Sequence, residues 1–544
     1  MNFLMALLLL VVGTTALPAQ VSYERLLQAE KEPGNWLTYS GSYKSQHYST
    51  LNQIRRDNVG NLELKWVFQA RSLEKFEATP LVVDQVMYVT QAPNDVVALD
   101  ARTGRAFWTY HHKVPKDVSL CCGLVNRGLA ILGDLLFMGT VDAHLLALDA
   151  KSGKLVWDVT VADYHGGYAL TLAPLVVKDR VIVGVAGGEY GIRGFLDAYE
   201  AKTGKRAWRF NTVPGPGEPG NETWPPDSWK NGGGSAWLTG SFDPELNLIY
   251  WGIGNPGPDW NGDVRQGDNL YTDSVVALDP GTGKLKWYFQ FTPHDVWDFD
   301  AVQIPVLVDM EFHGRARKLM LWGNRNGFYY VLDRITGEYL LGKPFAQVTW
   351  AEGLDDKGRP IRKPNSEPTF GGNRVYPGVQ GATNWYAPSY HPGTGLFYLS
   401  VWEYASVYHK GEPTYTRGNR YIGSFPVGAY PNVLVDDDPG YSAIRALDPK
   451  TGELKWEHKM TWLTEGGVIS TAGDVLFSGN MEGHFFALNC HTGELLWRVY
   501  LGGRVANSPI TYLVDGEQHV SIAAGNSLYT FALKKQSPAA PARK

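Results

Sequence analysis

The sequence has few cysteines, few charged residues and no long apolar segment, and these shortages exclude several classes of protein. None of its three cysteines stands in a CxxCH motif, so we expect no c-type haem on this chain. A total of 50 basic residues against 55 acidic ones, with no basic run, argues against a nucleic-acid-binding protein. No stretch approaches the ~18 uninterrupted apolar residues of a membrane-spanning helix, so we expect no membrane span.

The N-terminal stretch MNFLMALLLLVVGTTALPAQ has the pattern of a secretory signal peptide. Leu4 to Val12 is a short apolar run followed by small residues, although no lysine or arginine precedes it. At roughly ten residues the run is too short to cross a bilayer, and no cysteine follows it to accept a lipid. We therefore assign 1–19 to a signal peptide, 20–535 to one domain and 536–544 to a flexible C-terminal tail, and we expect a periplasmic protein.

Glycine (61) and tryptophan (19) are abundant, and both recur in one repeated phrase. Each copy reads as an apolar strand, a tight turn at glycine and a new strand that carries a large aromatic residue, as in ALDARTGRAFW and ALDPKTGELKW. The copies end at Trp108, Trp157, Trp208, Trp287, Trp456 and Trp497, with a weaker copy ending at Leu341 and a lead-in at Trp66.

The spacing of these copies predicts a β-propeller. Most neighbouring copies lie roughly 40 to 55 residues apart, which is about the length of a four-stranded blade. Two longer intervals, Trp208 to Trp287 and Leu341 to Trp456, contain proline- and glycine-rich loops and require insertions. We expect an all-β protein, an eight-bladed β-propeller with Trp-docking repeats, in which the repeated tryptophans pack blade against blade.

The adjacent pair Cys121–Cys122, in SLCCGLVNRG, allows three interpretations. The two residues can be buried apolar thiols, half of a metal site, or a disulfide between neighbours. Neighbouring Cα atoms are about 3.8 Å apart, below the about 4.4–6.8 Å that disulfides prefer, so a vicinal bridge strains its own backbone. Strain of this kind persists where it serves a function, and an oxidising compartment makes the bridge chemically possible.

A second set of motifs does not follow the repeat: KFEATP, CCGLVNRG, LTLAP, AGGEYGIRG, GGGSAWLTG, GIGNP, TPHDVWDFDA, GNRNGFYYVLD and ATNWY. Together with the repeats, from about Trp36 to Leu533, the chain resembles the quinoprotein alcohol dehydrogenases, the methanol and ethanol dehydrogenase family built around pyrroloquinoline quinone (PQQ). The resemblance implies oxidation of a small primary alcohol to the aldehyde by hydride transfer to metal-bound PQQ. It also implies that electrons pass to a soluble cytochrome c or another external acceptor.

The same resemblance implies a slot for the flat, three-carboxylate cofactor. A vicinal disulfide Cys121–Cys122 would cover one face of the ring, and Trp237 the other. An indole face suits a planar ring, and guanidinium groups bind carboxylates in pairs. The polar contacts that the resemblance implies around the edge are Glu77, Arg127, Thr171, Ser235, Arg325 and Asn384, with Ala186, Gly187 and Gly188 of one loop.

The resemblance further implies one metal ion held by Glu189, Asn255 and Asp298. Asp298 would also be the catalytic base, and Arg325 would stabilise charge that develops on the quinone. Asp300 adds a carboxylate that marks the lanthanide-dependent branch of the family, whereas the calcium branch generally has a small or uncharged residue there. Because another full negative charge favours a trivalent cation, we favour a lanthanide(III) ion over Ca²⁺.

The chain departs from the family pattern at LTEGGVISTAGD, where Glu465 replaces the tryptophan that precedes the double glycine of methanol enzymes. We therefore expect a different pocket. Two alternatives stay open. One is a calcium-dependent PQQ dehydrogenase for larger alcohols or sugars, with a pocket shaped by the insertions at 213–231 and 350–380. The other is a non-enzymatic envelope scaffold with similar repeats. A homodimer also stays open.

Overall fold

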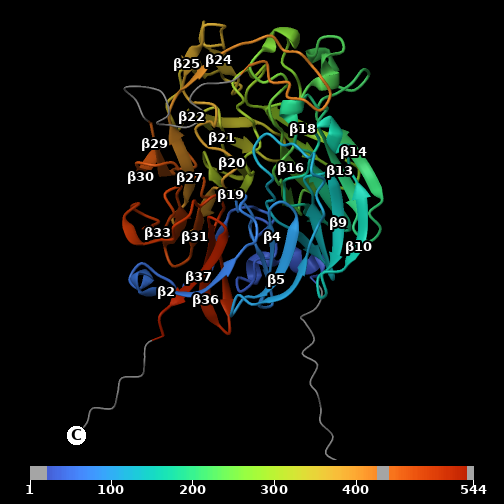
Figure 1. Ribbon diagram of the computed structural model, residues 1–544. Helices are drawn as coiled ribbons and strands as arrows, with labels where there is room; N and C mark the ends of the chain where they lie inside the picture. Colours follow the sequence, from blue (N-terminus) through green and yellow to red (C-terminus); the bar gives the residue numbers. More distant parts are fainter. Residues whose placement is uncertain (1–20, 425–439, 536–544) are drawn as a thin grey trace, which may run out of the picture.

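The computed structural model describes residues 21–424 and 440–535. The signal peptide expected at 1–19 and the tail expected at 536–544 lie outside this described part of the chain. The described residues fold into blades of antiparallel strands arranged in a ring (Figure 1). Within the described ranges, no helix is long and apolar enough to cross a bilayer.

Most blades are sheets of four consecutive strands, but β28 (Ser406–Tyr408) interrupts one of them, and two others include a strand from a distant part of the chain. The first four blades are β3 (Leu81–Val83), β4 (Val86–Gln91), β5 (Asp95–Asp100) and β6 (Ala106–Tyr110); β7 (Ala130–Leu132), β8 (Leu135–Gly139), β9 (His144–Asp149) and β10 (Leu155–Thr160); β11 (Leu175–Val177), β12 (Arg180–Gly184), β13 (Phe195–Glu200) and β14 (Arg206–Asn211); and β15 (Ser241–Asp243), β16 (Leu248–Gly252), β17 (Ser274–Leu278) and β18 (Leu285–Gln290).

The remaining blades complete the ring of eight and confirm the predicted all-β propeller. They are β19 (Val306–Phe312), β20 (Arg315–Gly323), β21 (Phe328–Asp333) and β22 (Tyr339–Pro344); β26 (Ser389–His391), β27 (Leu396–Glu403), β29 (Tyr441–Leu447) and β30 (Leu454–Met460); β31 (Ile469–Thr471), β32 (Val475–Gly479), β33 (His484–Asn489) and β34 (Leu495–Tyr500), joined by β1 (Tyr48–Ser49); and β35 (Ile510–Val514), β36 (Glu517–Ala524) and β37 (Ser527–Leu533), joined by β2 (Leu62–Gln69).

The last blade closes the ring by pairing the two ends of the chain. Strand β2, from the N-terminal part, runs antiparallel to β37, with Leu62 opposite Leu533 and Gln69 opposite Ser527. Strand β1 adds a parallel edge to β31. Figure 1 shows the blue β2 beside the red β36 and β37. Because both ends are held in sheets, the ring cannot open without breaking a ladder of backbone hydrogen bonds.

The helices are short and lie in the connections. One is an α-helix, α1 (Tyr23–Leu27), in which the Ser22 side chain accepts a hydrogen bond from the Arg25 backbone N–H and so caps the first turn. The others are single 3₁₀ turns: η1 (Ala29–Lys31), η2 (Val59–Asn61), η3 (Tyr164–Gly166), η4 (Gly188–Tyr190), η5 (Asn221–Thr223), η6 (Ser228–Asn231) and η7 (Gly262–Val264).

The insertions predicted from the long repeat intervals are present. One lies between β14 and β15 and carries η5 and η6. The other has two parts, with β23 (Ala351–Leu354), β24 (Pro360–Arg362) and β25 (Asn373–Val375) between β22 and β26, and β28 between β27 and β29. Strand β23 pairs with β24, and β25 pairs with β28. In Figure 1, β24 and β25 form the uppermost part of the molecule, beyond the blade sheets.

The repeated tryptophans dock between blades, as the sequence predicts. Trp108 on β6 reaches the turn of the next blade, where its indole Nε1–H donates to the Ala150 carbonyl at 3.2 Å. Gly153 of that turn has φ 70°, and a Cβ there would lie 2.4 Å from the Trp108 ring, so only glycine fits. Trp66, Trp157, Trp208 and Trp456 make the same contact with the carbonyls of Ala101, Ala201, Pro280 and Cys490.

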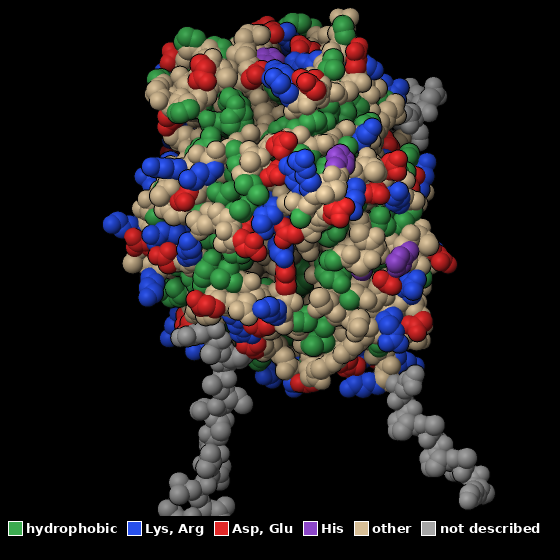
Figure 2. Space-filling view, turned by 180° about the vertical axis from the view of Figure 1, so that it is seen from behind, with side chains coloured by type: hydrophobic (Ala, Val, Ile, Leu, Met, Phe, Trp, Pro, Cys, Tyr) green, Lys and Arg blue, Asp and Glu red, His purple; other side chains and the backbone are tan. Residues whose placement is uncertain are grey.

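Burial within a blade follows strand position. The third strand of the second blade, β9, is buried along its middle, whereas its outer strand β10 alternates between exposed and partly buried side chains. Such alternation is expected where one face packs on a core and the other meets water. On the outer surface, basic and acidic side chains are interspersed (Figure 2), and no large area of one sign faces the viewer.

Candidate active site

The predicted site residues occupy two recurring positions in the blades. One group lies in the segments that precede the first strand of a blade: Glu77, Cys121, Cys122, Arg127, Thr171, Ser235, Trp237, Asp298, Asp300 and Asn384. The other group lies between the second and third strands: Ala186, Gly187, Gly188, Glu189, Asn255 and Arg325. In an up-and-down antiparallel blade both positions fall at the same end, opposite the docking turns. The propeller therefore gathers residues from six blades at one end of its axis.

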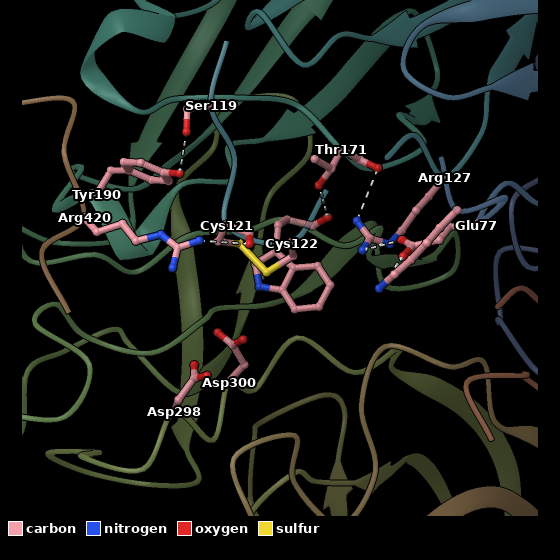
Figure 3. The surroundings of a disulfide bond; sticks show 12 residues. Glu77, Ser119, Cys121, Cys122, Arg127, Thr171, Tyr190, Asp298, Asp300 and Arg420 are labelled. Carbon is pink, nitrogen blue, oxygen red and sulfur yellow. Dashed lines mark hydrogen bonds and ion pairs between the residues drawn. A yellow bond between two sulfur atoms is a disulfide. The ribbon is translucent and has the colours of Figure 1, made fainter. Parts of the chain in front are cut away.

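Cys121 and Cys122 form a disulfide across a Cα–Cα distance of 3.8 Å. Cys122 is exposed and Cys121 partly exposed, so the interpretation as two buried thiols is wrong. The Arg420 guanidinium donates to the Cys121 carbonyl at 3.2 Å, and Figure 3 shows this contact beside the sulfur pair. The Glu189 carboxylate lies within 4.8 Å of the sulfur atoms. The bridge thus faces the acidic group assigned to the metal.

On one side of the disulfide lies a buried ion pair (Figure 3). Arg127 Nη2 lies 2.8 Å from a carboxylate oxygen of Glu77, and both residues are buried. The Arg127 guanidinium also lies over two indoles, 4.9 Å from the Trp237 ring and 4.8 Å from the Trp385 ring. Its Nη1 donates to the Thr171 carbonyl at 3.4 Å. This arrangement fixes a cation and two aromatic faces in one place.

Glu465, which replaces the family tryptophan, lies at the edge of this ion pair. It is buried, and its carboxylate forms an ion pair with Arg504. Burial raises the pKa of Glu77 above its usual range; Glu465 raises this pKa further, whereas Arg127, Lys75 and Arg504 lower it. Glu465 and Arg504 are thus two further charged groups that act on Glu77 of this ion pair, at the position where the sequence departs from the family pattern.

Asp298, Asp300 and Arg325 form the second cluster of the site. Arg325 Nη1 donates to Asp300 Oδ2 at 2.5 Å, and its Nη2 donates to Asp298 Oδ2 at 3.2 Å. Asp298 has φ 64°, a left-handed conformation that costs energy for a residue other than glycine. The carboxylate of Asp295 holds this turn, because it accepts the backbone N–H groups of Trp297 and Phe299 at 3.0 and 2.8 Å.

The pKa values of Asp298 and of the nearby Glu189 are raised. Burial is the main cause for Asp298; Asp300, Glu189 and Asp295 raise its pKa further, and Arg325 lowers it. Burial also raises the pKa of Glu189, with Asp300 adding to the effect. Negative charges that interact in this way disfavour ionisation, and a cation among them would oppose the shift and favour the ionised forms.

Asn255 and its neighbours complete the acidic cluster. The Asn255 backbone N–H donates to Asp300 Oδ1 at 2.9 Å. Gly254 permits this approach, because a Cβ there would lie 2.3 Å from the same oxygen. A Cβ on Gly188 would lie 3.2 Å from the Ser235 hydroxyl and 3.8 Å from the Asn255 amide oxygen. Glu189, Asn255, Asp298 and Asp300 are hard oxygen donors, which fit a hard cation.

Three predicted residues make contacts within the protein itself. Ala186 forms a backbone bridge with Ala169, and a Cβ on Gly187 would lie 2.0 Å from the Gly167 carbonyl. Asn384 uses both atoms of its amide locally: Nδ2 donates to the Gln380 carbonyl at 2.9 Å, and Oδ1 accepts from the Trp385 backbone at 2.8 Å. These residues shape the loops that border the site.

The prediction did not include Trp385 and Arg420. Trp385 stands within the motif ATNWY, directly after Asn384, so the motif contained it, but only Asn384 was predicted as a site residue. Arg420 lies in the long segment between β28 and β29, where no repeat and no motif marks it. Its contact with Cys121 depends on a chain crossing that the sequence pattern does not contain.

Comparison with known proteins agrees with this geometry. Residues 36–344 match the family model described as the glucose/ethanol/alcohol dehydrogenase beta-propeller domain. Residues 441–536, which carry the last Trp repeats, match the model of the outer membrane protein assembly factor BamB. The acidic cluster and the vicinal disulfide lie within the first match and outside the second.

Similar proteins cover nearly the whole chain. The quinoprotein alcohol dehydrogenase PedH of Pseudomonas putida is 40% identical, over 93% of this chain and 89% of its own. The lanthanide-dependent methanol dehydrogenase of Methylacidiphilum fumariolicum is 38% identical, over 92% and 86%. A solved europium-containing methanol dehydrogenase superposes with a TM-score of 0.88 at 35% identity and covers 94% of this chain and 100% of its own.

These relatives exclude the non-enzymatic scaffold, because they are named as enzymes and the similarity extends over most of their length and of this chain. The propeller, the vicinal disulfide and the acidic cluster at one end of the axis agree with the same assignment. The chain therefore belongs to the PQQ-dependent quinoprotein alcohol dehydrogenases.

Proposed function

We propose that this enzyme oxidises a primary alcohol to the aldehyde in the periplasm, with PQQ and one lanthanide(III) ion, and passes electrons to a soluble cytochrome c. The observation that carries the proposal is the cluster in which Arg325 bridges Asp298 and Asp300 beside Glu189 and Asn255. The N-terminal pattern at 1–19 supports export, and 20–535 would form the single catalytic domain.

The cofactor would lie between the disulfide and the indole faces of the site. PQQ supplies, when bound, an electron-poor quinone that takes the hydride from the alcohol carbon. Arg127, held between Trp237 and Trp385, would bind one of its carboxylates, and the Arg127 Nε–H has no hydrogen-bond partner among the described residues. Glu77, Thr171, Ser235, Asn384 and the loop Ala186–Gly188 would line the rest of the edge.

Asp298 would accept the proton of the substrate hydroxyl as general base. Its carboxylate is partly exposed and lies 3.2 Å from Arg325, so a substrate can reach it while its charge is balanced. Its pKa is raised in the protein alone, and a cation nearby would lower this pKa and favour the ionised form that a general base needs. Arg325 stays protonated between its aspartates and would stabilise the negative charge that develops opposite the base.

The metal would be held by Glu189, Asn255, Asp298 and Asp300, and would act as a Lewis acid. Asp300 supports a lanthanide over Ca²⁺, because its carboxylate adds a full negative charge to the donor set. A trivalent ion is attracted more strongly to this charge than a divalent ion is. The names of the lanthanide-dependent and europium-containing relatives support the same preference. A calcium-dependent dehydrogenase for larger alcohols or sugars remains the alternative, and Glu465 with Arg504 is the feature that favours another substrate.

The test is dye-linked alcohol oxidation by the purified protein with PQQ, over a panel of primary alcohols, with La³⁺ and Ca²⁺ in parallel. We expect turnover that depends on PQQ and on La³⁺. Turnover with Ca²⁺ alone would retain the reaction and overturn the metal assignment. A parallel reaction with cytochrome c in place of the dye tests the electron acceptor, and cytochrome c that stays oxidised would contradict that part.

A further inference from the structure

Asp259 is a buried carboxylate to which no role has been assigned so far. It lies in the loop between β16 and β17, in GIGNPGPDW, shortly after the metal-donor candidate Asn255. Its side chain is 1% exposed, and neither of its carboxylate oxygens has a hydrogen-bond partner among the described residues. A buried, ionised carboxylate without a partner is costly, so such a group is either protonated or compensated by a cation.

The surroundings of Asp259 are the proposed metal donors. Apart from burial, the groups that raise its pKa well above the usual range are, in order of effect, Asp298, Glu189 and Asp300. The Asn255 side chain acts in the opposite direction, although no hydrogen bond of good geometry joins it to Asp259. Asp259 also lies beside the turn that carries Asp298, because Arg265 Nη2 donates both to the Asp259 carbonyl at 3.4 Å and to the Asp295 carbonyl at 2.6 Å.

The buried cation Arg265 forms no ion pair with the Asp259 carboxylate. Its guanidinium donates to the backbone carbonyls of Pro258, Asp259 and Asp295 and to the Asn269 amide oxygen. Across residues 21–424 and 440–535, no ion pair within 4.0 Å joins Arg265 to any carboxylate. The attraction between Arg265 and Asp259 acts only over a longer distance.

The whole region carries an excess of negative charge. Two buried arginines, Arg265 and Arg325, face six interacting carboxyl groups. These groups are Glu189, Asp259, Asp273, Asp295, Asp298 and Asp300. A divalent ion would leave more of this charge uncompensated than a trivalent one would, and the interaction of each carboxylate with the ion scales with the charge of the ion.

We propose that Asp259 belongs to the cation site, where its unpartnered carboxylate increases the preference for a trivalent ion over a divalent one. Its contribution is a full negative charge near Asn255, in addition to the charges of Glu189, Asp298 and Asp300. This inference rests on the proposed function, because it requires that a cation bind between these residues.

The test compares cation affinities of the wild-type protein loaded with PQQ and of Asp259→Asn loaded in the same way. Tb³⁺ binding is measured by tryptophan-sensitised luminescence, and Ca²⁺ binding by competition and by calorimetry. We expect Asp259→Asn to weaken Tb³⁺ binding by about tenfold or more and to weaken Ca²⁺ binding clearly less, so that the Tb³⁺/Ca²⁺ selectivity falls. About tenfold is the effect of roughly 1.4 kcal/mol.

The matched control is Asp273→Asn. Asp273 is also fully buried, and both of its oxygens lack partners, but the charge that acts on it most strongly is Asp295 rather than a proposed metal donor. We expect its selectivity to stay within about threefold of wild type, a difference of less than 0.7 kcal/mol by the same conversion. Asp259→Ser provides a second neutral substitution, in case the first does not fold.

Each outcome separates this inference from the proposed function. If the wild-type protein binds neither ion, the proposed function itself is overturned. If the wild type binds Tb³⁺ and both Asp259 variants keep its selectivity, only this inference fails. An equal loss of affinity for both ions would also overturn it, because that is the effect of a purely structural residue.

Discussion

The two ends of the propeller differ in whether their buried polar groups have hydrogen-bond partners. At the end of the docking turns, the indole N–H groups of Trp66, Trp108, Trp157, Trp208 and Trp456 each donate to a carbonyl of the next blade, whereas that of Trp287 is buried without a partner among the described residues. At the end of the site, Asp259 and the Nε–H groups of Arg127 and Arg325 are buried without hydrogen-bond partners among the described residues.

This difference shows which end stabilises the fold and which end is prepared for ligands. Satisfied hydrogen bonds and glycines packed on tryptophan rings hold the blades together. Unpartnered buried charges cost stability and persist where a ligand completes them. Substitutions at the end of the site should therefore reduce activity or metal binding, whereas substitutions at the end of the docking turns should reduce stability.

The largest expected effect is on activity, from Asp298→Asn. Removing the proposed general base should lower kcat by about 10²- to 10⁴-fold, measured by dye-linked alcohol oxidation with PQQ and La³⁺. The amide has nearly the same shape, so the thermal midpoint of the protein should change little. A variant that keeps more than a tenth of the wild-type kcat would contradict the role of Asp298.

The next effect concerns stability in acid, through His47 in the scaffold. His47 is buried, its Nδ1 lies 2.6 Å from the Val468 carbonyl, and burial lowers its pKa from 6.5 to about 4. Between these values the unfolded chain binds the proton more strongly, so the free energy of unfolding falls as the pH falls from 6.5 to 4. The full loss is about 3 kcal/mol.

Denaturant titration across this pH range measures the effect of His47. The variant His47→Gln should show a smaller pH dependence than wild type, with the difference confined to the range between pH 6.5 and 4. An unchanged slope in His47→Gln would assign the acid sensitivity to other groups.

A smaller effect is expected at a docking turn, from Gly153→Ala. The added Cβ would lie 2.4 Å from the Trp108 ring at a residue with φ 70°. Overpacking of this kind costs about 1–3 kcal/mol in free energy of unfolding. Gly516→Ala is the matched control, because Gly516 has φ 79° but no atom within 4 Å of its Cβ position. Equal losses in both variants would show that backbone strain, rather than Trp docking, is responsible.

The smallest effect is expected from Asp268→Asn. Asp268 pairs with Arg359 at 2.7 and 2.9 Å, but both side chains are exposed. Such pairs contribute about 0.2–1 kcal/mol, so the denaturation midpoint should hardly move. Cation selectivity should stay at the wild-type value, in contrast with Asp259→Asn. A selectivity loss as large as that of Asp259→Asn would mean that exposed charge alone sets the preference.

The repeats made the fold predictable from the sequence, and the motifs between them made much of the site predictable. The successive repeats that contain Trp108 and Gly153 predict the docking contact, because the tryptophan and the glycine recur at fixed spacing. Asp298 and Glu189 stand in motifs long enough to carry a resemblance. The grouping of these motifs at one end follows from their position relative to the strands.

The contacts that escaped prediction join segments far apart in the chain. Arg420 reaches Cys121, and Arg504 pairs with Glu465, without any local pattern that announces either contact. Asp259 stood next to the motif GIGNP, but an acidic residue in a loop is usually solvated, and only its burial distinguishes it. Burial and convergence of this kind depend on the ring as a whole.

The most direct test of the account is the thermal unfolding of the purified protein with PQQ and La³⁺, each alone and both together. If the unpartnered groups at one end await these ligands, the midpoint should rise most with both, and a ligand present at 100 times its Kd should add about 2.7 kcal/mol to stability. Gly153→Ala should start from a lower midpoint and show the same rise. An unchanged midpoint at saturating PQQ and La³⁺ would contradict the account.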